Sequence, residues 1–238
     1  MQPATCLPNY CFCEKITSGA IAQPANAWSS LSFVVVGLLI VCLAVKDKKG
    51  GTNPLTTIWV YGVLYGFILS IIGVGSFYYH SKLNFVGQFI DVLGMYLLAT
   101  AILFYRYFTA TKTKAAWAVS SYILFNMFFS YILYTFPNAR RYIFAFLIIA
   151  ILGLEYRLKK QLNLLINRKF LYVAVAILSI AFIIWVLDIT KIFCSPTSLF
   201  QGHALWHILG ALSSSLIYLY YRSEQINPTL SNPTLEKQ

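Results

Sequence analysis

The chain has 238 residues, of which 59% are hydrophobic and 11% are charged, and its mean hydropathy is +0.69. Soluble domains carry about 25% charged residues, so this composition excludes an ordinary soluble domain and indicates a polytopic membrane protein. The formal net charge of +11 could suggest a nucleic-acid partner. The positions of the basic residues favour a different explanation, and we expect no nucleic-acid binding.

Apolar runs long enough to cross a bilayer follow one another along the chain. A spanning helix needs about 20 mostly apolar residues, and the fourth run is the most diluted because it contains serines and an asparagine. We therefore expect an all-α fold, an integral membrane bundle of seven transmembrane helices (25–222) between an extracytoplasmic N-terminal segment (1–24) and a disordered cytosolic tail (223–238). The seven runs lie near residues 25–45, 55–80, 84–106, 115–135, 141–157, 170–188 and 202–222.

Basic residues are distributed unevenly between the two sides of the predicted bundle. Most of the 18 lysines and arginines follow the first, third and fifth helices or lie in the tail. The positive-inside rule then places the C-terminus in the cytosol and the N-terminus outside, and the basic charge is explained as a topology signal. The opposite side has only Lys15, Lys82, Arg140, Arg141 and Lys191.

Four cysteines lie on the predicted outer side. The N-terminal segment contains Cys6, Cys11 and Cys13, and the loop before the last helix contains Cys194. Disulfides form in extracytoplasmic compartments, so a bridge between the N-terminal cluster and Cys194 is feasible. Free thiols or a small metal site are the alternatives, because cysteine spacing does not fix connectivity.

Polar residues of the second and third helices lie near their predicted outer ends. Ser76 and His80 are four residues apart and therefore share a helix face. Asp91 lies about two turns into the third apolar run, where an unpaired carboxylate is costly and should face a partner inside the bundle. The next three helices have no acidic residue in their apolar centres, and we interpret Glu155 and Asp188 at their ends as interface charges.

The last helix begins with QGHALWHILG, in which His203 and His207 are four residues apart on one face. The topology places these two residues and His80, the only other histidine, in the outer half of the bundle. Three imidazoles and a water form the open site of a catalytic zinc ion, which activates water for hydrolysis. Asp91 could act as general base or orient a histidine, and Ser76 could hydrogen-bond the oxyanion of an attacked carbonyl.

Two further residues of the last helix are candidate contacts for a lipid substrate. Trp206 lies between the two histidines, and Ser214 lies on their face one layer deeper. Helix packing is the alternative for Ser214. The alternative for the histidines and Asp91 is that they only bridge helices through hydrogen bonds.

The combination of Ser76-x-x-x-His80, Asp91 eleven residues further on and His203-x-x-x-His207 on the last of seven helices resembles the alkaline ceramidases. They are one branch of the superfamily that includes adiponectin-receptor-like and Per1-type proteins, and the resemblance covers the whole chain in length and helix count. It implies zinc on the three histidines, assisted by Asp91 and Ser76. It also implies hydrolysis of the ceramide amide to a sphingoid base and a fatty acid. The predicted orientation favours this branch over the receptors.

The N-terminal segment departs from this family pattern. Animal alkaline ceramidases have an Asp-Trp-Cys-Glu run that helps to bind calcium, where this chain reads CFCE at 11–14, and Asn26 matches a further acidic residue. Glu14 is kept while two carboxylates are lost, so the resemblance does not supply a full set of calcium ligands. The same alignment implies a Cys13–Cys194 disulfide and leaves the other two N-terminal cysteines unassigned.

The sequence therefore favours a multi-pass membrane amidase that uses zinc to cleave ceramide or a related N-acyl sphingoid lipid near the extracytoplasmic face. A seven-helix lipid-sensing receptor with structural zinc is one alternative. A membrane lipid esterase or remodelling enzyme is another, because the same zinc–water chemistry attacks esters. The sequence makes no prediction of oligomeric state.

Overall fold

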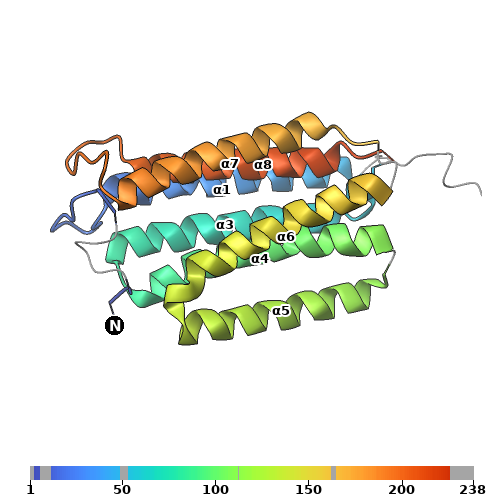
Figure 1. Ribbon diagram of the computed structural model, residues 1–238, viewed down its shortest axis with the longest axis horizontal. Coiled ribbons are helices and arrows are strands. Elements are labelled where there is room, and N and C mark those ends of the chain that lie inside the picture. The colour runs from blue at the N-terminus through green and yellow to red at the C-terminus, as the bar shows by residue number, and fades with distance from the viewer. Residues whose placement is uncertain (1–2, 6–11, 49–52, 112, 162–164, 226–238) are drawn as a thin grey trace, which may run out of the picture.

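The computed structural model describes residues 3–5, 12–48, 53–111, 113–161 and 165–225 (Figure 1). Within these ranges the protein is all-helical, and seven of its helices have 21 to 27 residues. A four-residue helix, α2 (Pro54–Thr57), and a 3-10 turn, η1 (Pro137–Ala139), complete them. The long helices are α1 (Pro24–Asp47), α3 (Trp59–Lys82), α4 (Phe85–Thr111), α5 (Ala115–Thr135), α6 (Arg140–Gln161), α7 (Arg168–Ile189) and α8 (Gly202–Arg222).

Each predicted apolar run coincides with a long helix to within a few residues at its ends, and only the second run is divided. The run near 55–80 is divided at Ile58, which has a non-helical ψ of 49°. Asn53 accounts for the separate first turn, because its side-chain oxygen accepts the Leu55 N–H at 2.6 Å and its carbonyl accepts the Thr56 hydroxyl at 2.7 Å. These bonds cap α2 and let α3 begin in a new direction.

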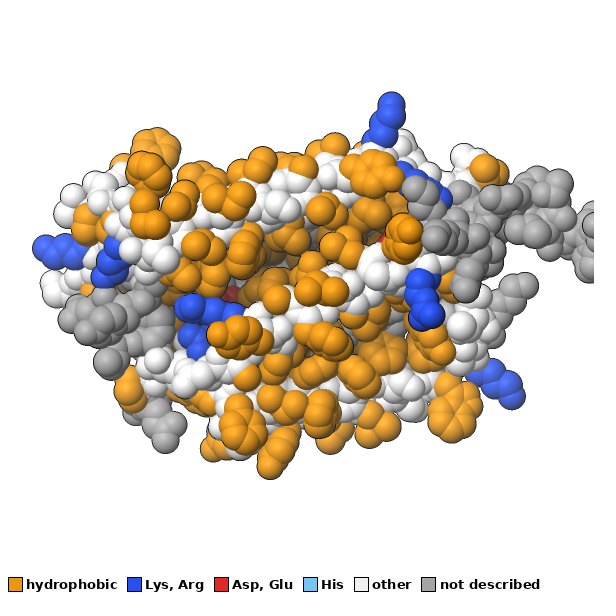
Figure 2. All heavy atoms as spheres, in the orientation of Figure 1, with side chains coloured by type: hydrophobic (Ala, Val, Ile, Leu, Met, Phe, Trp, Pro, Cys, Tyr) orange, Lys and Arg blue, Asp and Glu red, His pale blue; other side chains and the backbone are white. Residues whose placement is uncertain are grey.

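Five helices, α1, α3, α4, α5 and α7, are long and apolar enough to cross a membrane. Helices α6 and α8 have similar lengths but are less apolar. Helix α8 contains two histidines and three consecutive serines, and α6 begins with two arginines. Hydrophobic side chains dominate the face in Figure 2, which fits contact with lipid. The chain is thus a multi-pass membrane protein, and the count of seven spans with its orientation stays a prediction.

The helices pack in an order that follows the chain only in part. Helix α8 packs against both α7 and α1, α1 packs against α3, and α3 packs against α4 (Figure 1). Helices α5 and α6 both pack against α4. Helix α6 is not closely packed against α7, and Figure 2 shows a hollow between these two helices with acidic side chains visible in its depth.

A two-residue turn joins α3 to α4 and fixes the relative position of the polar residues on each helix. Leu83 ends α3 in the left-handed conformation with φ 47°. The Asn84 side-chain oxygen then accepts the Gly87 N–H at 2.8 Å and caps the start of α4. His80 and Asp91 are thereby held on adjacent antiparallel helices, as the sequence predicts.

The end of the bundle at which α8 finishes, the predicted inner end, contains a buried ionic network. The Arg106 guanidinium contacts Glu155 at 2.9 Å and Glu224, just after α8, at 2.9 Å. The hydroxyls of Tyr220 and Tyr221 donate to the two oxygens of Glu155 at 2.7 and 2.9 Å. Glu155 is therefore a buried partner that joins α4, α6 and α8, and its interpretation as an interface charge is wrong.

Candidate metal centre and active site

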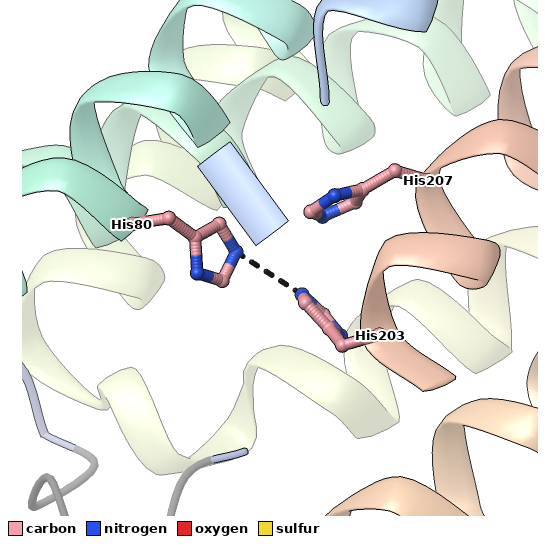
Figure 3. Close-up of side chains that lie close together, drawn as sticks. All are labelled: His80, His203 and His207. Atoms are coloured by element: carbon pink, nitrogen blue, oxygen red, sulfur yellow. Dashed lines mark hydrogen bonds between the residues drawn. The ribbon is translucent and has the colours of Figure 1, made fainter. Parts of the chain in front are cut away.

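Three histidines from two helices converge at the end of the bundle that holds the N-terminal segment. His80 lies on α3, and His203 and His207 lie one turn apart on α8. All three are buried, and their candidate ligand atoms lie within 4.8 Å of one another. Figure 3 shows the three rings pointing toward one another, with 3.1 Å between the Nε2 atoms of His80 and His203. The predicted convergence of these residues is confirmed.

The second ring nitrogen of two of these histidines contacts a neutral side chain of the α1 region. His80 Nδ1 lies 2.9 Å from Gln23 Oε1, and His207 Nδ1 lies 3.0 Å from Ser29 Oγ. The Gln23 amide nitrogen donates to the Glu14 carbonyl at 3.1 Å, which fixes its oxygen as the acceptor toward His80. The Nδ1 of His80 therefore carries the proton, and its Nε2 lone pair faces the other histidines.

These residues fit a zinc ion. Zinc binds imidazole nitrogen at 2.0–2.1 Å, so two ligands in a tetrahedral site lie about 3.3 Å apart, close to the observed 3.1 Å. Neutral imidazoles are its preferred nitrogen ligands, and hydrogen bonds to their outer nitrogens orient such ligands. The cluster can hold a metal ion, and zinc is compatible with it.

Ser76 and Asp91 lie beside the histidines. Ser76 Oγ is 3.3 Å from His207 Nε2 and also hydrogen-bonds the Asp91 carboxylate. The glycine at 75 permits this approach of α3 to α4, because a Cβ there would lie 2.8 Å from the Ile90 side chain and 3.1 Å from the Asp91 nitrogen. A serine and a carboxylate thus stand next to the candidate metal ligands, in the arrangement that the sequence predicts.

The N-terminal segment covers the histidines at their end of the bundle. Cys13 and Cys194 form a disulfide, as the family resemblance implies. This bond holds the Phe12 ring against His203, with 3.9 Å between the ring centroids, and 5.0 Å from the His80 ring. Phe12 therefore covers the cluster at this end of the bundle. The remaining N-terminal cysteines, at positions 6 and 11, lie outside the described residues.

Asp188 ties this segment to the start of α8. It is only 1% exposed, and its two oxygens accept the Cys13 N–H and the His203 N–H, both at 3.1 Å. The carboxylate thereby caps the N-terminus of α8, where the helix dipole favours negative charge. A Cβ at Gly202 would lie 2.9 Å from the Asp188 Cβ, so only glycine allows this contact. The interpretation of Asp188 as an interface charge is wrong.

Comparison with known proteins connects this geometry to a family. A family model described as ceramidase matches residues 2–234. The chain belongs to the ceramidase family. This ceramidase-family chain is similar to "Alkaline ceramidase" of Drosophila melanogaster, at 26% identity over 112 residues, which is 45% of this chain and 37% of that protein. It is also similar to "Putative alkaline ceramidase dcd3B" of Dictyostelium discoideum, at 28% identity over 174 residues, 63% of this chain and 60% of that protein. These alignments therefore span less than two thirds of either relative.

The calcium-binding residues of the family resemblance have other contacts in this ceramidase-family chain. The Glu14 oxygens accept the N–H groups of Ala25 at 2.7 Å and Asn26 at 2.9 Å and so cap α1. Burial raises the pKa of Glu14, and these two N–H groups oppose that rise. Calcium prefers six to eight oxygen ligands with several carboxylates, whereas the carboxylates of Glu14 and the nearby Asp188 are both engaged with backbone N–H groups and the Asn26 amide is the other candidate ligand. They do not fit calcium, and no step is assigned to that ion.

The two predicted substrate contacts on α8 have other partners. Trp206 faces α7, where its ring lies 6.0 Å from that of Trp185. The Ser214 hydroxyl donates to the Gly210 carbonyl of its own helix at 2.9 Å, and its carbonyl accepts the Tyr65 hydroxyl at 2.8 Å. Both contacts agree with packing roles, and a substrate role for either residue stays a prediction.

Sequence reasoning missed the residues that surround the histidines. Gln23 and Ser29 are neutral and belong to an otherwise ordinary helix start, so no local pattern singles them out. Asp188 did have a signal, because a carboxylate at the end of an apolar helix is costly without partners. That cost predicts a buried capping role, which the structure shows.

Proposed function

We propose that this protein is an integral-membrane, zinc-dependent amidase that hydrolyses ceramide, or a related N-acyl sphingoid lipid, to a sphingoid base and a free fatty acid. The observation that carries the proposal is the buried cluster of His80, His203 and His207 beside the Ser76–Asp91 pair, in a chain of the ceramidase family. Membership of that family supports the amide substrate, and the histidine cluster supports the metal.

The three histidines would hold the zinc ion through their inward nitrogens, with Gln23 and Ser29 fixing two of the rings. When bound, the ion would act as a Lewis acid and lower the pKa of a water to about 7. Asp91 accepts a proton from the attacking water at a carboxylate oxygen and delivers it to the amide nitrogen as the C–N bond breaks. The hydroxyl part of the water thus joins the acyl carbon, and the proton leaves with the amine.

Ser76 has a separate task in this reaction. Its hydroxyl lies between His207 and Asp91 in the substrate-free arrangement. When the carbonyl of a lipid binds beside the histidines, the Ser76 hydroxyl turns to the carbonyl oxygen and stabilises the negative charge that develops there. Phe12 keeps outer water away from this region, which strengthens that hydrogen bond.

The substrate enters from the bilayer. The hollow between α6 and α7 opens on the apolar face in Figure 2 and gives the acyl chain a lateral route into the bundle. Under the positive-inside orientation the histidines lie toward the extracytoplasmic face, so cleavage takes place in that half of the membrane.

The test is fatty-acid release by the purified protein, with zinc measured on the same sample. We expect about one zinc per chain and turnover of an N-acyl sphingoid lipid. In His207→Ala the zinc content and the turnover are both expected to fall to background. Ser215→Ala is the matched control, because Ser215 lies on the same helix and its hydroxyl bonds only its own turn, to the Leu212 carbonyl. Retained turnover in His207→Ala would contradict the metal mechanism.

Two further arms separate the alternatives. An ester analogue with the same acyl chain distinguishes an amidase from a lipid esterase or remodelling enzyme. Stoichiometric zinc without turnover of either lipid would indicate a lipid-sensing protein that keeps the metal as a structural element, and would contradict the proposed hydrolysis.

A further inference from the structure

Two adjacent arginines begin α6 at the end of the bundle that holds the histidines. Arg140 is half-buried and Arg141 is exposed. Among the residues that the structure describes, neither forms a salt bridge. The two cations repel each other, and Asp91, the carboxylate that attracts Arg140, forms no salt bridge with it.

Both arginines act electrostatically on the candidate active site. Arg140 interacts with Asp91 on α4, and Arg141 interacts with His203 on α8. The hydrogen bonds of Arg140, to Thr5 Oγ1 at 3.0 Å and to the Pro137 carbonyl at 2.8 Å, both use Nη1 and both go to neutral acceptors. Both guanidinium groups thus act on the reacting groups without a direct ion pair.

Arg141 also lies where the lipid would enter. Its guanidinium lies over the Trp185 ring of α7, 4.8 Å from the ring centroid, and so bridges α6 and α7. Figure 2 shows basic side chains at the end of the hollow where α6 begins. Stacking on an aromatic ring orients a guanidinium while leaving its edge N–H groups available to an anion.

Topology does not account for this pair. The positive-inside rule disfavours basic residues on the predicted outer side, and a neutral lipid would leave both arginines without an ion-pair partner. In a sphingoid lipid the headgroup is carried by the carbon next to the one that bears the amide nitrogen. A headgroup therefore lies close to the scissile amide, which the histidine cluster would hold.

We propose that Arg140 and Arg141 form a subsite for a phosphate-type anionic headgroup, so that the preferred substrate is an N-acyl sphingoid lipid with an anionic rather than a neutral headgroup. The inference rests on the proposed function. Guanidinium groups bind phosphate oxygens through paired N–H bonds, and the headgroup supplies a directly contacting anion to both arginines. Arg141 favours anionic over neutral lipids at the entrance of the hollow, and Arg140 holds the headgroup nearer to Asp91.

The test compares ceramide with ceramide 1-phosphate of the same acyl chain, using the zinc-loaded full chain in neutral detergent. We expect kcat/KM to be at least about tenfold higher for the phosphorylated lipid, mainly through KM, because one charge-assisted pair contributes this much. Arg141→Gln is expected to reduce the ratio of the two values about tenfold, and Arg140→Gln should act in the same direction. Lys15→Gln removes an exposed cation from the same side and leaves the ratio unchanged.

The outcomes separate this subsite from the hydrolytic function. Hydrolysis of ceramide at an equal or higher kcat/KM, with the same ratio in Arg141→Gln, would overturn the subsite alone. Hydrolysis of neither lipid would overturn both. Inhibition by inorganic phosphate that depends on Arg141, without any headgroup preference, would reveal a free-anion site and overturn the headgroup proposal. Arginine-dependent inhibition by the fatty-acid product alone would also overturn it. If a variant fails to fold, the wild-type protein still tests the proposal. The ratio of its kcat/KM values for the phosphorylated and the neutral lipid must fall as added salt screens the two arginines.

Discussion

The two ends of the helix bundle both bury polar side chains, but they compensate charge differently. At the inner end Arg106 contacts Glu155 and Glu224, and two tyrosine hydroxyls complete Glu155. At the histidine end the imidazole nitrogens face one another, and Asp91 has a hydrogen bond from Ser76 and only a longer-range attraction to Arg140. One end pairs opposite charges, and the other brings together groups that need a ligand.

This difference separates stability from function. A buried charge with partners on three helices fixes the position of those helices and costs much to break. Three buried imidazoles that face one another bring no opposite charges together, and such a cluster is typical of a binding site. We therefore expect substitutions at the inner end to change unfolding and substitutions at the histidine end to change metal binding and turnover.

The largest expected effect is on turnover at the histidine end. Asp91→Asn keeps the shape of the side chain but removes the proton acceptor, so we expect kcat to fall about 10²- to 10⁴-fold. The zinc content and the thermal midpoint should stay close to wild type. The measurement is fatty-acid release at saturating lipid, with metal analysis and a melting curve on the same sample. A variant that also lost zinc would show that Asp91 acts on the histidines rather than on the water.

The largest expected loss of stability is at the opposite end. Arg106→Met leaves Glu155 and Glu224 buried without their cation, and breaking such a network costs about 3–5 kcal/mol. Thermal or denaturant unfolding in detergent measures the loss, and turnover per folded molecule should be nearly unchanged. Arg157→Met is the matched control, since Arg157 lies on the same inner end of α6 and is exposed. Equal destabilisation by both variants would show that the network has no special role.

Much of the histidine end of the bundle could be predicted from the sequence. Helix count and the alternating direction of the helices place all three histidines at the same end of the bundle, and the family resemblance then implies that they share one site. The carboxylate of Asp91 is predictable for the same reason and because its burial requires a partner.

The surroundings of the site could not be predicted in the same way. Gln23 lies at the start of α1, whose packing against α3 and α8 is a tertiary result and leaves no periodic signal in the sequence. The ionic network depends on Glu224, which follows the last helix and lies in the segment interpreted as a disordered tail. A residue beyond a helix end gives no sign of which distant side chain will meet it.

A smaller effect is expected from the α1 residue that contacts His207. Ser29→Ala removes the 3.0 Å contact to Nδ1, and the loss of such an outer partner lowers metal affinity about 10- to 100-fold. Zinc competition against a chelator measures this change. Ser32→Ala is the matched control, since its hydroxyl reaches the His207 backbone carbonyl at 3.3 Å and not the ring. Equal affinities in the two variants would contradict an orienting role for Ser29.

The smallest effect concerns the two attachments of the N-terminal segment. Asp188→Asn weakens the cap of α8 and the hold on the Cys13 N–H, and we expect about 1 kcal/mol of lost stability while the Cys13–Cys194 disulfide is intact. In a Cys13→Ser background the same substitution should cost more, because the carboxylate is then the main remaining hold on the segment that carries Phe12. Unfolding of the two single variants and the double variant gives the coupling energy. Strict additivity would mean that Asp188 and the disulfide act on separate parts of the structure, and that the cover over the histidines depends on the covalent bond alone.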